Sequence, residues 1–185
     1  MPTGFLEQMR LFQANVSITA GTTRGQVKPG KLAAIRASLA DLDLQSFSVL
    51  AEDCFQEALD QSTKDLVSKE VPWGTARKTL NIFLRDAYYN FYLRPLFSPN
   101  LPNESWFEVP LDSRVGLKLS SYDRTLKKWE TIKDLASNDH HQYQQTARCY
   151  AQKIHKVARV HLDIYLWPGY HPNAILSAPP AIDTE

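Results

Sequence analysis

The chain has 185 residues, of which 43% are hydrophobic and 22% are charged, and its formal net charge is +1. This composition is typical of a globular protein and excludes collagen-like, low-complexity and strongly charged disordered chains. The length favours a single domain that buries a sizeable hydrophobic core. No apolar run approaches the roughly 18–20 residues that a membrane-spanning helix needs, so no membrane partner is expected.

The N-terminal segment and the cysteines bear on the cellular compartment. Residues 1–15 carry Glu7 and Arg10 inside an apolar pattern, which differs from the uninterrupted apolar core of a secretory signal. Cys54 and Cys149 lie within helical patterns and have neither CxxC nor metal-ligand spacing. We therefore expect a reduced, cytoplasmic protein with buried thiols.

Apolar residues recur at helical spacing along most of the chain, and few stretches alternate as strands do. Helices are expected over residues 1–15, 31–44, 46 to about 59, 74 to about 93, a short helix that Asp112 caps, 127–135 and 138–167. A loop rich in glycine and threonine fills residues 16–30 and matches no nucleotide-binding motif. Ser62 or Thr63 is expected to cap a short turn. The sequence predicts an all-α fold of seven or eight helices, with a single domain at 1–167 and a proline-rich tail at 168–185.

Charge is distributed unevenly along the chain. Residues 45–70 carry six acidic residues and two lysines, whereas residues 71–94 carry four basic residues and one aspartate. In the second stretch Arg77, Asn81 and Arg85 repeat every fourth residue and are expected on the outer side of a helix. Such a basic face can meet phosphate groups or can simply be solvated.

Two short segments carry a resemblance to a known family. Residues 72–84 read PWGTARKTLNIFL, which resembles the hairpin and following helix of endonuclease III-type DNA glycosylases, members of the helix-hairpin-helix superfamily. Residues 109–115 read VPLDSRV, which is similar to the segment in which that family carries an aspartate. Ala76 stands where the family has a second glycine, and Arg114 stands where histidine is usual.

The resemblance implies a fold, a partner and residue roles. The fold would be a helix-hairpin-helix glycosylase-like domain that acts on duplex DNA without a cofactor. Lys78 would attack the sugar and form a Schiff base, and Asp112 would stabilise the developing positive charge or activate the nucleophile. The nucleic-acid-binding residues implied in this way are Gly74, Thr75, Arg77, Asn81, Arg85 and Arg114.

Other interpretations of the same residues remain open. Lys78 and Arg77 can be solvated residues of a first helical turn, and Asp112 can be an N-cap worth about 1 kcal/mol. The chain would then be a non-enzymatic all-α interaction module. Alternatively, Lys78 and Asp112 would act on a small ligand in a pocket too narrow for DNA. The histidines form no HExxH motif, and no metal site is expected.

Overall fold

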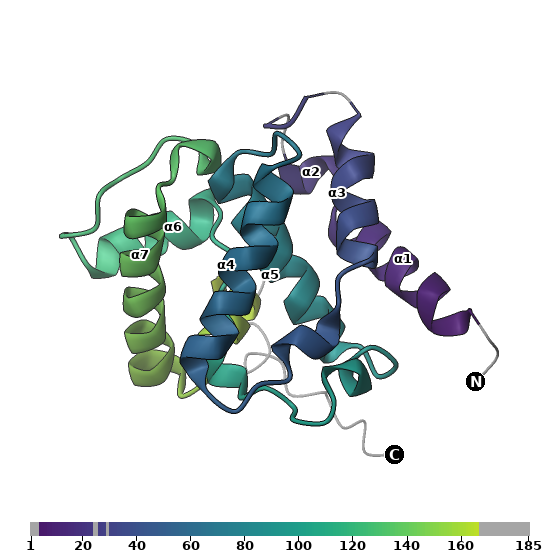
Figure 1. Ribbon diagram of the computed structural model, residues 1–185. Helices are drawn as coiled ribbons and strands as arrows, with labels where there is room; N and C mark the ends of the chain where they lie inside the picture. The colour runs from purple at the N-terminus through teal and green to yellow at the C-terminus, as the bar shows by residue number, and fades with distance from the viewer. Residues whose placement is uncertain (1–3, 24–25, 29, 167–185) are drawn as a thin grey trace, which may run out of the picture.

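The computed structural model describes residues 4–23, 26–28 and 30–166, and these residues form helices and loops without a strand (Figure 1). The all-α prediction is therefore confirmed for the described part of the chain. The helices are α1 (Phe5–Ser17), α2 (Ala20–Thr23), α3 (Lys31–Ala40), α4 (Glu52–Val67), α5 (Trp73–Tyr89), α6 (Ser113–Tyr122), α7 (Ser137–Tyr150) and α8 (Leu162–Leu166). Shorter 3₁₀ turns occupy Leu44–Phe47, Arg94–Phe97, Glu104–Trp106, Ile132–Asp134 and Arg159–His161.

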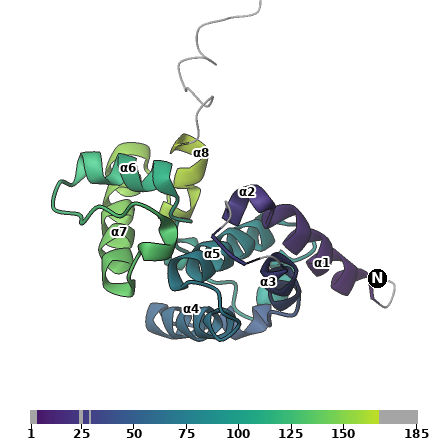
Figure 2. The same ribbon diagram turned by 90° about the horizontal axis from the view of Figure 1, so that it is seen from above.

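The interior consists of two hydrophobic clusters. The first is built mainly from α1, α3, α4 and α5 and contains the fully buried Phe55 and Phe83. The second is built mainly from α6, α7 and α8 and contains Leu119 and Tyr143. Figure 2 shows α6, α7 and α8 on one side of α5 and α1, α2 and α3 on the other. The chain passes from the first cluster to the second at a single charged residue, Glu108, between Phe107 and Val109.

Helix α5 is the central element because it is buried on more than one side. Its apolar residues Leu80, Phe83 and Leu84 are within 1% of complete burial, as the apolar spacing predicts. Arg77 and Asn81 are also buried, each only 3% exposed. The prediction that these two residues face outward is wrong, since both bind the buried carboxylate of Glu108.

Several predicted helix boundaries differ from those observed. Helix α4 continues through Ser62 and Thr63, and the Thr63 hydroxyl donates to the Leu59 carbonyl inside the helix instead of capping a new turn. Helix α5 ends at Tyr89, since the Asn90 side chain accepts hydrogen bonds from the next backbone N–H groups. The predicted helix over 127–135 is reduced to one 3₁₀ turn.

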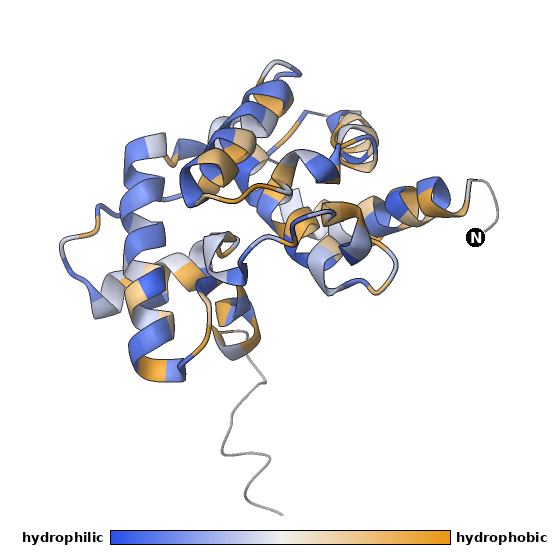
Figure 3. Ribbon diagram, turned by 60° about the horizontal axis from the view of Figure 1, so that its bottom comes forward, coloured by the Kyte–Doolittle hydropathy of each residue, from blue (hydrophilic) through white to orange (hydrophobic). Residues whose placement is uncertain are grey.

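The predicted helix over 138–167 is broken. Helix α7 ends at Tyr150, a wider π-helical turn follows, and Lys156 adopts a left-handed conformation with φ of 59°. The chain then turns back, and the guanidinium of Arg159 donates hydrogen bonds to the carbonyls of Phe107 and Gln144. Figure 3 shows that α7 is mainly hydrophilic, and its buried residues include the polar His140, Gln144 and Thr146. The predicted tail at 168–185 lies outside the described residues.

Two further expectations concern the thiols and the membrane. Cys54 and Cys149 are both exposed and unpaired by a disulfide, so the expectation of buried thiols is wrong. Among the described residues, no helix combines the length and the apolar character that crossing a bilayer requires.

Gly74 holds the first turn of α5 against the second cluster. A Cβ atom at this position would lie 1.9 Å from the carbonyl oxygen of Ile132, which is a backbone atom. We predict that Gly74→Ala lowers the free energy of unfolding by about 1–3 kcal/mol or more, because the chain must shift to relieve the overlap. Urea unfolding measures this change.

Gly21→Ala is the matched control. Its Cβ would meet only the Thr19 hydroxyl at 3.5 Å, which is an ordinary contact. Alanine in a helix is favoured over glycine by roughly 0.5–1 kcal/mol, so this variant should be as stable as the native protein or slightly more stable. Equal unfolding midpoints for the two variants would contradict the packing argument.

Candidate active site

The residues that the sequence singles out separate into two groups in the structure. Lys78, Asp112, Arg85 and Arg114 line one cavity of about 590 Å³. Gly74, Thr75, Arg77 and Asn81 lie in the interior instead. Lys78 and Asp112 are 34 positions apart in the sequence, and both line this cavity.

The cavity lies where the two groups of helices meet. Its walls come from the end of α1, from α2, from one face of α5, from the segment that precedes α6, and from α8. Six of the lining side chains are charged, three of each sign: Lys78, Arg85, Arg114, Asp86, Asp112 and Asp163. A cavity of this size and mixed charge is suited to a small polar ligand or to one unit of a larger molecule.

Lys78 reaches the cavity from the first turns of α5. Its side chain is held between α5 and α2, where the Nζ donates to the Thr22 carbonyl at 2.8 Å. Only 9% of the residue is exposed. Ile82, Arg85 and Asp86 lie on the same face of α5, four, seven and eight residues further on, as helical periodicity requires.

Asp112 is fixed by its role as the N-cap of α6, which confirms the cap that the sequence predicts. Its Oδ1 accepts hydrogen bonds from the backbone N–H groups of Arg114 and Val115, both at 2.9 Å. The preceding backbone is held as well, because the Gln144 side chain accepts from the Val109 N–H and donates to the Val109 carbonyl. The carboxylate is thus positioned by α6 on one side and by α7 on the other.

Asp163 adds a second carboxylate from α8. Its side chain is 14% exposed and forms an ion pair with Arg85, whose Nη2 also lies 2.8 Å from Asp86. Burial raises the pKa of Asp163 to about 6, the positive charge of Arg85 opposes the rise, and the negative charge of Asp112 adds to it. Burial alone would lower the pKa of Arg85, but Asp86 and Asp163 raise it, so this arginine stays charged.

The interior group forms a separate network around Glu108. Arg77 binds this carboxylate through two parallel hydrogen bonds of 2.8 and 3.0 Å. Asn81 donates to it at 2.8 Å, and the Nε2 of His140 lies 3.4 Å away. Burial would raise the pKa of Glu108, but the charges of Arg77, His140 and Arg159 hold it well below its usual range. Arg77 and Asn81 therefore serve this network and present no surface to a phosphate.

The surroundings of Gly74 and Thr75 also do not match the phosphate-binding role that the resemblance implies for them. Gly74 is buried beneath the Ile132 carbonyl, and Thr75 is 1% exposed and donates to the Gln26 side chain at 3.2 Å. A nucleic-acid phosphate therefore cannot reach this turn in the present conformation. Of the implied nucleic-acid-binding residues, only Arg85 and Arg114 line the cavity.

The sequence predicts no role for two residues that are important in the structure, Glu108 and Asp163. Glu108 is the one charged residue in the stretch Trp106–Leu111, and an isolated charge among apolar residues signals a buried, paired carboxylate. Asp163 gives no comparable signal, because its position depends on the break after α7. Among the described residues, no group of three or more histidine, cysteine, aspartate or glutamate side chains is placed to hold a metal ion.

No protein-family model matches this chain, and no similar protein was found among curated proteins or solved structures. The function therefore has to be inferred from the cavity and from its chemistry.

The Glu108 network should dominate the stability of the junction between the clusters. We predict that Glu108→Gln destabilises the protein by about 3–5 kcal/mol, since Arg77 would lose its buried counter-charge. Glu104→Gln is the matched control, because Glu104 is 51% exposed and pairs only with His161 at 3.3 Å. In chemical unfolding, the control should lower the free energy of unfolding by less than about 1 kcal/mol. A similar loss of stability in both variants would refute the importance of the network.

His140 should make this stability depend on pH. Burial lowers the pKa of His140 to about 4, with Glu108 opposing and Arg77 and Arg159 adding to the effect. Between pH 6.5 and 4 the unfolded chain then binds a proton that the folded chain does not, so stability falls as pH falls. A loss of roughly 1 kcal/mol per pH unit is expected from this proton in that window.

The contribution of His140 is isolated by comparison with His140→Gln. The raised pKa of Asp163 has the opposite effect on stability over much of the same range, so the absolute pH dependence mixes both groups. The stability difference between the native protein and His140→Gln should shrink as pH falls from 7 to 5. A difference that stays constant over this range would show that His140 does not titrate as described.

Proposed function

We propose that this protein is an enzyme that uses Lys78 as an amine nucleophile toward a sugar carbonyl or anomeric carbon, with Asp112 as its electrostatic partner. The observation that supports it best is that both side chains, from distant parts of the sequence, line one cavity of about 590 Å³. The chemistry proposed is that of a nucleic-acid glycosylase or lyase.

The surroundings of Lys78 suit a nucleophile. An amine attacks in its neutral form, which low solvent access and a nearby cation favour in general. Lys78 is 9% exposed, and Arg85 lies on the same wall of the cavity. Asp112 would stabilise the positive charge that develops on the sugar or on the imine nitrogen.

The nucleic-acid substrate rests on two arguments. Residues 72–84 and 109–115 resemble the corresponding segments of helix-hairpin-helix DNA glycosylases. The cavity is too small for a duplex but suits a single nucleotide, so the reacting unit would be extruded from its strand. Arg114, which is exposed at the start of α6, would contact a flanking phosphate.

A second candidate function is favoured by the burial of Gly74, Thr75, Arg77 and Asn81. If the substrate were DNA, these residues would supply most of the contacts to the DNA backbone, but internal packing buries them. The substrate in that case would be a free small aldehyde, such as a sugar phosphate, that enters the same cavity and reacts with Lys78.

Borohydride trapping separates these candidates. The native protein is incubated with a duplex containing an abasic site, or with 2-deoxyribose 5-phosphate, in the presence of the reductant, and the covalent adduct is measured by mass spectrometry. We predict an adduct with the duplex that is lost in Lys78→Ala and reduced at least about tenfold in Asp112→Asn. An adduct with the free sugar alone would favour the second candidate.

Lys64→Ala is the matched control for the lysine, because Lys64 lies on α4 away from the cavity. It should form as much adduct as the native protein. If the native protein forms no adduct with either probe, the enzyme proposal fails. The exposed Phe12, Leu50 and Phe91 would then favour the non-enzymatic interaction module.

Salt dependence tests the nucleic-acid contacts directly. Binding of an abasic duplex should weaken as salt rises, because each contacted phosphate releases counterions. We predict that Arg114→Ala lowers the slope of log K against log salt by about 1, whereas Arg124→Ala, remote from the cavity lining, leaves it unchanged. Salt-independent binding by the native protein would contradict a nucleic-acid substrate.

A further inference from the structure

We propose that Asp163 is the proton donor of this site, acting on the oxygen that leaves when the Lys78 imine forms. The inference rests on the proposed function, which assigns roles to Lys78 and Asp112 and leaves Asp163 without a role. Three elements would then supply three roles: α5 the nucleophile, the start of α6 the electrostatic partner, and α8 the acid.

The position of Asp163 supports this role. It is 14% exposed and lines the same cavity as Lys78 and Asp112. Arg85 fixes its side chain through an ion pair, and Arg85 is fixed in turn by Asp86, whose Oδ2 accepts a hydrogen bond of 2.6 Å from Ser17. A buried carboxyl held in this way is kept within reach of a ligand in the cavity.

Among the three carboxylates of the cavity, Asp112 and Asp163 have different surroundings. Asp112 accepts two backbone hydrogen bonds at a helix N-terminus, where a carboxylate interacts favourably with the helix dipole. Asp163 is desolvated and faces the negative charges of Asp112 and Asp86, which favour the neutral acid, whereas its ion pair with Arg85 opposes this effect. Two carboxyl groups in contrasting environments commonly divide the acid and the charge-stabilising roles between them.

The proposed step balances as follows. The nitrogen of Lys78 forms a bond to the substrate carbonyl carbon, the C=O bond becomes a C–O single bond, and proton exchange gives a neutral carbinolamine. The acid form of Asp163 then donates its proton to the carbinolamine hydroxyl, the C–O bond breaks, and water leaves. The nitrogen lone pair forms the C=N⁺ bond of the iminium, and Asp163 remains as a carboxylate beside Arg85.

The pH dependence involves every ionisable group that faces Asp163. The charges of Arg85, Asp86 and Asp112 act on Asp163, and Asp163 in turn acts on Tyr89. Lys78 and Arg114 line the same cavity, and His161 lies in the turn just before α8. Since the pKa of Asp163 is about 6, its acid form is lost as pH rises through 6. The rate of iminium formation should therefore show a descending limb near this pH.

The test measures the rate of iminium formation between pH 5 and 8, with cyanoborohydride trapping of an abasic duplex under single-turnover conditions. Asp163→Asn should lower the rate by about 100-fold and should abolish the descending limb. Asp163→Glu should retain a carboxyl for Arg85 and should keep the limb. This second variant keeps the test valid if Asp163→Asn is too unstable to assay.

Asp86→Asn is the matched comparison, since it also removes a carboxylate from Arg85 but leaves the proposed acid in place. It should keep the descending limb even if its rate falls. If the native protein traps substrate and Asp163→Asn retains both its rate and its limb, this inference is overturned and the proposed function stands. If the native protein forms no adduct, the proposed function fails and this inference fails with it.

Discussion

The buried Glu108 carboxylate is the interaction on which the arrangement of the two hydrophobic clusters depends. It lies at the point where the chain leaves one cluster for the other, and it binds Arg77 and Asn81 from α5 and contacts His140 from α7. A carboxylate without these partners would be costly to bury, so the two clusters can pack together only when α5 and α7 supply them. The pairing therefore selects one arrangement of the helices.

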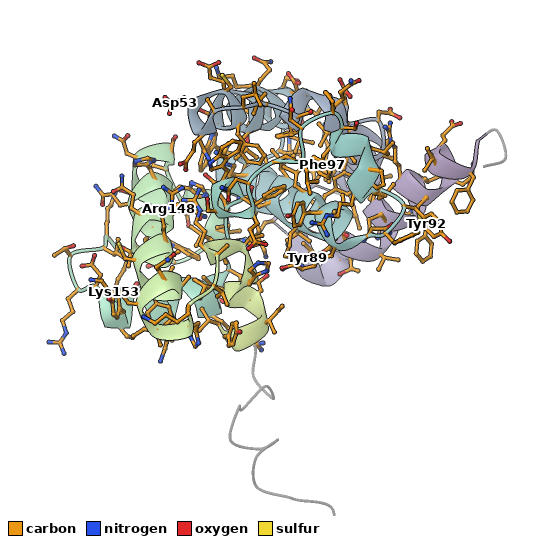
Figure 4. The ribbon with its side chains drawn as sticks, turned by 90° about the horizontal axis from the view of Figure 1, so that it is seen from below. Asp53, Tyr89, Tyr92, Phe97, Arg148 and Lys153 are labelled. Carbon is orange, nitrogen blue, oxygen red and sulfur yellow. The ribbon has the colours of Figure 1, made fainter. Side chains whose placement is uncertain are left out.

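An ion pair near the surface supports the same junction. Arg148 on α7 forms an ion pair with Glu52 at the start of α4, and Figure 4 shows Arg148 on the side of α7 that faces the rest of the molecule. Both residues are partly exposed, so this pair contributes less than the buried one. Arg159 adds buried hydrogen bonds, since its guanidinium donates to carbonyl groups on both sides of the junction.

Helix α5 connects this junction to the cavity. Arg77 and Asn81, one turn apart, face Glu108, and Lys78 and Ile82, each one residue further along, face the cavity. Because successive helical residues are rotated by a fixed angle, the contacts of Arg77 also set the direction of Lys78. A residue that seemed from the sequence to be a phosphate ligand thus acts as a positioning residue for the candidate nucleophile.

The sequence predicts what local physics controls and misses what depends on distant partners. The all-α class and the cap by Asp112 follow from periodicity and from the hydrogen bonds of neighbouring residues. The predicted orientation of Arg77 is wrong because its partner, Glu108, is 31 positions away and lies at the junction between the two clusters. The break after α7 was missed because the position of Arg159 depends on a distant contact, the hydrogen bond from its guanidinium to the Phe107 carbonyl.

The cavity follows from these same non-local constraints. Asp163 joins its wall because the chain turns back after α7, which brings α8 against Arg85. That turn is held by Arg159, whose own contacts lie at the junction that Glu108 organises. Burial lowers the pKa of Arg159 to about 10, with Glu108 opposing the shift, so the guanidinium remains charged at neutral pH. The geometry of the candidate site is thus coupled to the buried charges at the centre of the fold. A substitution in the Glu108 network should alter the cavity, and a substitution in the cavity should alter the network.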